Sequence, residues 1–233
     1  MKQIGYIVLI LLFVPCFIHG QVLFSLTSDA SLLRNLSPQQ KFWSFGQTIQ
    51  GQFHFSKKES AYIWVCYYTP GIYKNSYTAV EKNPGTIPSQ INYTVRGRWL
   101  PRQMSIGWRH YLKGSFDNND TWNLYTIVGF GIMISTLQNT FNLPIDTSKY
   151  TIPSNPIEGN SSFRRLTFDL GLGGEFAIGS DIFLYGEGRI LTPASDKNPS
   201  SYFHNYSHVP LSLTMNAGIR VLFNFDYGEG SEK

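Results

Sequence analysis

The sequence predicts an all-β fold, an eight-stranded antiparallel β-barrel that crosses a membrane, and three observations lead to this prediction. Apolar residues recur at every second position over long segments, as they do in β-strands with two different faces. These segments are about ten residues or longer, as tilted membrane-crossing strands require, whereas soluble strands average about five or six. After residue 20 no apolar run approaches the roughly 18 residues of a membrane-spanning helix.

The composition agrees with a single barrel domain. The chain has 233 residues, of which 15% are aromatic and only 15% are charged, and it contains 21 glycines. Frequent glycine with many aromatic residues is typical of β-barrels. The net charge of +4 is scattered and forms no basic run, so we expect no nucleic-acid partner.

The first twenty residues have the pattern of an export signal. Lys2 supplies a positive charge, residues 7–18 are almost wholly apolar, and the small Gly20 precedes Gln21. We therefore expect a cleaved signal peptide at 1–20, the barrel at 21–225 and a short periplasmic tail at 226–233. Cys16 lies in the signal without the small residues of a lipoprotein motif, and Cys66 alone would remain, so no internal disulfide is possible.

Alternation places each strand in turn. The clearest case is the segment 211–225, where Leu211, Leu213 and Met215 begin an apolar face and Ser212, Thr214 and Asn216 begin a polar one. Residues 165–178 repeat this pattern. The eight expected strands are 22–34, 42–55, 61–72, 92–112, 122–136, 163–178, 182–192 and 210–225.

The connections alternate in length. Residues 56–60, 113–121 and 179–181 are short and polar, whereas 73–91, 137–162 and 193–209 are longer and hold most of the Pro and Asn, without strand alternation in 137–162. An even number of strands puts both termini on one side together with the short turns. Outer-membrane barrels have short periplasmic turns and long external loops, so we expect periplasmic termini.

The polar faces of the strands are expected to line the lumen, although a soluble lipocalin-like barrel would have the opposite arrangement. They carry charges at mid-strand, including Asp29, and Trp and Tyr lie near strand ends as interfacial girdles require, at Trp43, Tyr93, Trp108 and Trp122. The side chains of an eight-stranded barrel roughly fill its interior, so charges of both signs should pair there. The expected lumen charge network comprises Arg109, Asp169, Glu175, Glu187, Arg189 and Arg220.

The last strand carries a motif that resembles the insertion signal of outer-membrane barrels. In residues 216–223 a polar residue precedes Gly218, and Val221 and Phe223 follow on the lipid face; the tail after the aromatic residue departs from many such proteins. The whole chain resembles the small outer-membrane barrels of Bacteroidota, which are related in architecture to OmpA, OmpX and OmpW. The resemblance implies a multi-pass outer-membrane protein without a cofactor. Its implied partners are outer-membrane lipids including lipopolysaccharide, and the barrel assembly machinery during insertion.

A tight turn at 179–181 would set the register of its hairpin. Ile178 would pair with Ile182, which places Gly174 opposite Gly186 and Leu172 opposite Gly188 on the outward face. Gly174, Gly186 and Gly188 could then form a groove where a partner or a lipid docks. The alternative is that these glycines relieve bending strain in a curved sheet.

The sequence contains no Ser/His/Asp, phosphate-loop or zinc-site signature. His204 and His208 are spaced as metal ligands would be on a helix, but they lie in a Tyr- and Asn-rich loop. We expect a non-enzymatic structural or binding component, an accessory subunit of a larger outer-membrane complex. One alternative is a narrow channel for small apolar solutes, as the OmpW resemblance implies. Another is a lipid A-modifying enzyme that uses Asp146, Ser207 and a histidine, or His110 at the membrane edge.

Overall fold

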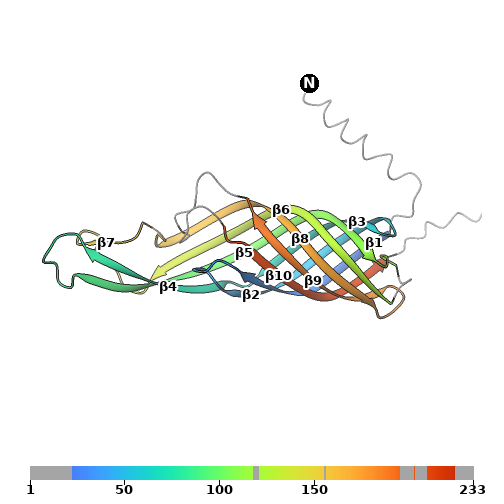
Figure 1. Ribbon diagram of the computed structural model, residues 1–233, viewed down its shortest axis with the longest axis horizontal. Coiled ribbons are helices and arrows are strands. Elements are labelled where there is room, and N and C mark those ends of the chain that lie inside the picture. Colours follow the sequence, from blue (N-terminus) through green and yellow to red (C-terminus); the bar gives the residue numbers. More distant parts are fainter. Residues whose placement is uncertain (1–22, 118–120, 155, 195–201, 203–208, 224–233) are drawn as a thin grey trace, which may run out of the picture.

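A computed structural model describes residues 23–117, 121–154, 156–194, 202 and 209–223 (Figure 1). The expected signal peptide at 1–20, the tail at 226–233 and the end of the last expected strand lie outside these residues. The described strands are β1 (Leu23–Asn35), β2 (Trp43–Ser56), β3 (Glu59–Tyr68), β4 (Gly71–Glu81), β5 (Gln90–Lys113), β6 (Trp122–Phe141), β7 (Tyr150–Thr151), β8 (Gly159–Ala177), β9 (Ile182–Pro193) and β10 (Ser212–Phe223).

Eight of these strands close into an antiparallel barrel, which confirms the predicted fold class. β1 pairs with both β2 and β10, and β3 pairs with the second half of β5. The closed order is β1-β2-β3-β5-β6-β8-β9-β10, so no edge remains around the barrel. The short connections β2–β3, β5–β6 and β8–β9 lie at one end (Figure 1). No helix in the described part of the chain is long and apolar enough to cross a membrane.

The hairpin of β8 and β9 has the predicted register. The amide of Ile178 donates to the carbonyl of Ile182 at 2.9 Å, and Gly174 pairs with Gly186. The three-residue turn therefore sets the pairing of β8 with β9. A register shift of one residue would have moved every side chain of one strand to the opposite face of the sheet.

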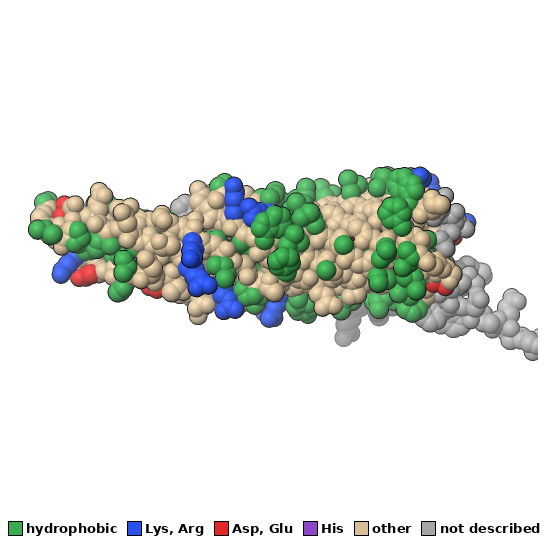
Figure 2. Space-filling model, turned by 90° about the horizontal axis from the view of Figure 1, so that it is seen from below, with side chains coloured by type: hydrophobic (Ala, Val, Ile, Leu, Met, Phe, Trp, Pro, Cys, Tyr) green, Lys and Arg blue, Asp and Glu red, His purple; other side chains and the backbone are tan. Residues whose placement is uncertain are grey.

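Side-chain exposure alternates with the polar side inward. Leu166 and Phe130 on the outer surface are 63% and 61% exposed, whereas Arg109 in the lumen is fully buried. Figure 2 shows groups of apolar side chains on one face of the outside of the barrel. Exposed leucine and phenylalanine over a whole circumference would be unfavourable in water, so this surface is the one that lipid covers.

An aromatic girdle surrounds the short-turn end. Phe24 contacts the tilted ring of Phe53 at a centroid distance of 5.2 Å and stacks with Phe223 at 6.1 Å. Phe55 stacks on Trp108 at 5.4 Å. Trp122 lies at the same end, under the ammonium of Lys113, and Trp43 lies at the other end, under the guanidinium of Arg34. Aromatic rings with a polar neighbour suit the two membrane interfaces.

The expected loop at 73–91 is wrong, because most of it is strand. The expected strand 61–72 breaks at Pro70, which lacks an amide, and the chain continues as β4. β4 pairs with the first half of β5, with Tyr77 opposite Tyr93, and the two form a ribbon that extends beyond the barrel (Figure 1).

The expected loop at 137–162 is also shorter than predicted, since β6 continues to Phe141 and β8 begins at Gly159. Tyr93 is not in a girdle: it is buried in a second core with Ala79, Val95 and Tyr150. The ribbon is built from polar residues that alternate with tyrosine and small side chains. This composition resembles that of a loop, so the sequence pattern did not distinguish the two.

Candidate functional site

The lumen holds most of the residues that the sequence marks as a candidate site. Arg109 comes from β5, Glu175 from β8, Glu187 and Arg189 from β9, and Arg220 from β10. Strand alternation directs all five inward, and each is at most 6% exposed. The small inner residues Gly171 and Gly173 pair with Arg189 and Glu187, which leaves room for these long side chains.

Five of these charges form one alternating chain. Arg220 contacts Glu175 with both Nε and Nη2, at 3.0 and 2.8 Å. Arg109 then bridges Glu175 at 3.6 Å and Glu187 at 3.2 Å, and Arg189 pairs with Glu187 through Nε. β5 and β9 are separated by two strands on the shorter path around the barrel, so the chain of charges crosses the lumen.

Aromatic rings fill the space around the three guanidinium groups. Arg109 lies 3.8 Å from the centroid of Tyr125 and Arg220 lies 3.8 Å from that of Phe183, while Arg189 lies 4.4 Å from that of Trp64. Such contacts are worth about 2 kcal/mol when water is absent. The hydroxyl of Tyr125 donates to Glu187 at 3.2 Å. The described side chains of the lumen therefore form an ion-paired and aromatic cluster across the barrel.

Asp29 and Asp169 share the lumen but do not join this chain of ion pairs. Asp29 accepts hydrogen bonds from Thr48 and Tyr185. Asp169 is fully buried, and within the described residues it has no basic group at ion-pair distance. The structure therefore leaves Asp169 outside the ion-paired part of the expected network.

The sequence reasoning missed a polar cluster that seals the short-turn end. His54 lies between the hydroxyls of Ser25 and Ser60, each 2.7 Å from a ring nitrogen, and stacks on Phe116 at 4.4 Å. Arg220 donates to Ser25 at 3.0 Å and to the carbonyl of Phe116 at 2.8 Å. The alternation of the second strand does place His54 inward, and that was the available signal.

Of the residues considered for catalysis or metal binding, only Asp146 and His110 are described, and they lie in different parts of the fold. His204, Ser207 and His208 lie outside the described residues, and Asp146 lies between β6 and β7, where it accepts a hydrogen bond from Ser148 at 2.6 Å. His110 pairs with Glu59 at 2.6 Å near the short-turn end. Across the residues that the structure covers, no three potential ligands converge as a metal site would require.

The outward glycines lie where the sequence places them. A β-carbon at Gly174 would come no closer than 3.5 Å to a neighbour, and one at Gly186 or Gly188 no closer than 4.0 Å. Gly186 also pairs with Ala217, which pairs with Ala30, so small residues continue across β8, β9, β10 and β1. Packing within the barrel therefore does not require glycine at these positions.

Within the expected insertion signal, Gly218 faces the lumen and Phe223 faces the outer surface of the barrel. Gly218 lies inward against Asp29, where a β-carbon would collide with it. Val221 is half-buried, and Phe223 is exposed on the outside, where it belongs to the girdle.

Solved structures resemble this chain to different degrees. Neisserial surface protein A is similar with a TM-score of 0.52 and 11% identity, over 86% of this chain and 97% of that protein. OprG from Pseudomonas aeruginosa matches with a TM-score of 0.47 and 11% identity over 89% and 98%, and the protease OmpT from Escherichia coli with 0.40 and 8% over 89% and 100%. No protein-family model matches the chain, and no curated protein sequence matches it.

The likeness to Neisserial surface protein A concerns the fold. Together with the outward apolar surface, it shows that this chain has the fold of a small bacterial outer-membrane β-barrel, with eight strands that cross the membrane.

Proposed function

We propose that this barrel is a non-enzymatic structural or binding component of the bacterial outer membrane, an accessory subunit that acts through its outer surfaces. The observation that carries the proposal is the closed lumen. The chain from Arg220 to Arg189 is buried, ion-paired and packed against aromatic rings. A solute path through it would have to separate buried ion pairs, and breaking one costs about 3–5 kcal/mol.

The test of closure is conductance in planar lipid bilayers. We expect no stable conductance steps from the purified protein. A Glu187→Ala variant removes the carboxylate shared by Arg109 and Arg189. This variant should conduct ions if the chain of ion pairs alone closes the lumen. Stable steps from the unaltered protein would favour the channel alternative over this proposal.

The outward small residues are the proposed docking face. Gly174, Gly186 and Ala217 leave a shallow strip where lipid-facing strands carry large apolar side chains, and small residues allow another backbone to approach closely. Because a β-carbon at the outward-facing Gly186 would come no closer than 4.0 Å to a neighbour, Gly186→Leu should fold and should weaken recovery of a membrane partner.

The matched control for the docking face is Val65→Leu, which adds bulk to the outer surface of β3, across the barrel from β9. Co-purification from the native outer membrane measures both variants. Equal partner recovery from both would contradict the docking proposal, and failure of Gly186→Leu to fold would indicate that the glycine serves curvature.

A further inference from the structure

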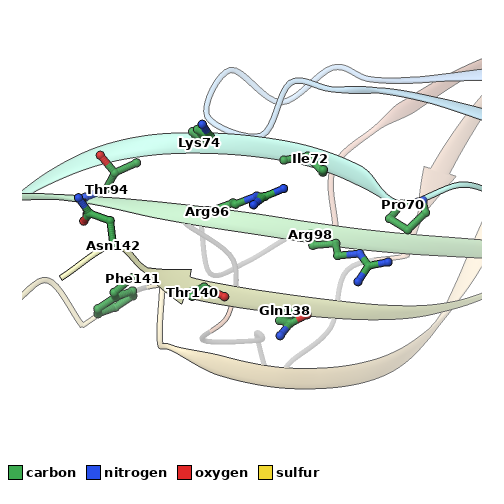
Figure 3. A pocket seen from close by; sticks show the side chains of 10 residues that line it. All are labelled: Pro70, Ile72, Lys74, Thr94, Arg96, Arg98, Gln138, Thr140, Phe141 and Asn142. Atoms are coloured by element: carbon green, nitrogen blue, oxygen red, sulfur yellow. Dashed lines mark hydrogen bonds between the residues drawn. The ribbon is translucent and has the colours of Figure 1, made fainter. Parts of the chain in front are cut away.

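A cluster of basic side chains lies on the outer surface where the barrel meets the ribbon. Lys74 extends from β4 and Arg96 and Arg98 from β5, and all three are exposed (Figure 3). Lys74 is directly opposite Arg96, and Ile72 is opposite Arg98. Figure 2 shows basic side chains at this transition. Two more exposed arginines, Arg102 and Arg164, flank Ile134 on the neighbouring strands.

Among the described residues, these five cations have no acidic partner at ion-pair distance, since no carboxylate there lies within 4.0 Å of any of them. The carboxylate of Glu158 accepts a hydrogen bond from the amide of Phe141 at 3.1 Å and forms no ion pair with a described residue. Like charges directly opposite each other destabilise a sheet, so the arrangement of Lys74 and Arg96 is favourable when an anion lies between them.

The cluster surrounds a hollow of about 850 Å³. The three cations line this hollow together with two other kinds of side chain. Gln138, Thr140 and Asn142 supply hydrogen-bonding groups, and Pro70, Ile72 and Phe141 supply apolar groups. A second hollow of about 500 Å³ shares Pro70, Arg98 and Gln138 and adds Asn160, Ser161 and Ser162. Cations beside hydroxyl and amide groups suit a phosphorylated sugar.

The position of the basic cluster along the barrel axis indicates which phosphorylated sugar can reach it. Arg98 lies ten residues along β5 from Trp108 of the short-turn girdle. At about 3.4 Å per residue and a tilt of about 40°, this separation rises about 25 Å, the height of the apolar band of an outer-membrane barrel. Below the hollow the surface is apolar, with exposed Ile132, Phe130 and Leu166. A ligand here therefore has its anionic part at the membrane boundary and can extend acyl chains along the barrel.

We propose that Lys74, Arg96 and Arg98 form a binding site for the phosphorylated sugar headgroup of an outer-leaflet glycolipid, the lipid A part of lipopolysaccharide. Arg102 and Arg164 add charge from below through side chains long enough to reach the boundary. The proposal rests on the outer-membrane role above and on periplasmic termini, which put the ribbon end in the outer leaflet.

Binding of purified lipopolysaccharide to the full chain in detergent micelles tests the site. We expect the double variant Arg96→Gln/Arg98→Gln to lose at least about tenfold in affinity, a change of about 1.4 kcal/mol. The unaltered protein should bind dephosphorylated lipid A more weakly than lipid A, and added salt should reduce the difference. The control Lys57→Gln/Lys58→Gln removes the same charge from an exposed turn at the opposite end and should bind as the unaltered protein does.

Equal affinity of the arginine variant and the unaltered protein would overturn the proposal, as would an equal loss in the lysine control. A heparin-type polysaccharide that binds through the same arginines while lipid A does not would also overturn it and would indicate a soluble polyanion. Conductance of the same variants is measured separately, so failure of lipid binding is distinguishable from failure of lumen closure.

Discussion

Arg220 of β10 and Glu175 of β8 form a two-point ion pair inside the barrel, with Nε–Oε2 at 3.0 Å and Nη2–Oε1 at 2.8 Å. The two strands are not neighbours, because β9 lies between them. Glu175 also accepts hydrogen bonds from Asn123 and Tyr111, both at 3.0 Å. The carboxylate is therefore the point at which four strands, β5, β6, β8 and β10, are joined through the lumen.

Glu175→Ala should destabilise the barrel strongly, because it leaves Arg220 and Arg109 buried without this carboxylate. We expect a loss of about 3–5 kcal/mol, measured by urea unfolding in lipid vesicles. Glu59→Ala is the control, since this acid is partly exposed and pairs with His110 at the rim, and it should cost no more than about 1 kcal/mol. Similar losses in the two variants would contradict a structural role for the lumen network.

Inner and outer glycines should differ in their tolerance of a methyl group. A β-carbon at Gly173 would collide with the ring of Tyr125, whereas one at Gly186, on the adjacent strand, would come no closer than 4.0 Å to a neighbour. Gly173→Ala should therefore cost about 1–3 kcal/mol through overpacking. Gly186→Ala should change the free energy of unfolding by less than about 0.5 kcal/mol in the same assay. The reverse order would show that the outer glycine, and not the inner one, is structurally required.

The ribbon should open without loss of the barrel when its own core is disrupted. Tyr93 packs on Phe141 at 5.2 Å and on Tyr77 at 5.8 Å. Tyr93→Ala should speed proteolytic cleavage at 82–89 by about tenfold or more, because local opening depends on local packing. Thr94→Ala, one residue along on the other face, is the control. Both variants should keep the migration of the folded barrel in unheated gels. Loss of the barrel together with the ribbon would show that the two parts unfold together.

Protease added to intact cells tests the orientation. With periplasmic termini, cleavage should fall in the connections at 82–89 and 142–149, and it should spare the turns at 57–58 and 179–181. In cells with a permeabilised outer membrane, the protease should also cleave the turns at 57–58 and 179–181. Cleavage of the turns alone in intact cells would invert the topology and would remove the basis for an outer-leaflet lipid site.

The strands of the barrel and their faces could be predicted from the sequence because both depend on local alternation. Leu166 and Phe168 lie on one face of their strand and Thr167 on the other, since the side-chain period of a strand is two. The charges on the polar faces then indicated which face lines the lumen. The register of β8 and β9 also followed from sequence, because a three-residue turn between Ile178 and Ile182 leaves one pairing. The ribbon was not predicted, since its Tyr-rich alternation outside the lipid band lacks a continuous apolar face.

Depth counted from the short turns predicts that Arg109, Glu175, Glu187 and Arg220 lie together, but only the tertiary structure decided which of these inward charges pair. Arg109 and Glu187 are 78 positions apart, and their contact at 3.2 Å depends on barrel closure and on the stagger of eight strands. Asp169 faces the same lumen and remains without an ion pair among the described residues, which alternation could not distinguish. The basic cluster has the same origin: Lys74 and Arg96 are ordinary exposed residues in sequence, and the pairing of β4 with β5 places them side by side at the membrane boundary. Alternation determines the face of a residue, whereas closure and register determine its neighbours across the barrel.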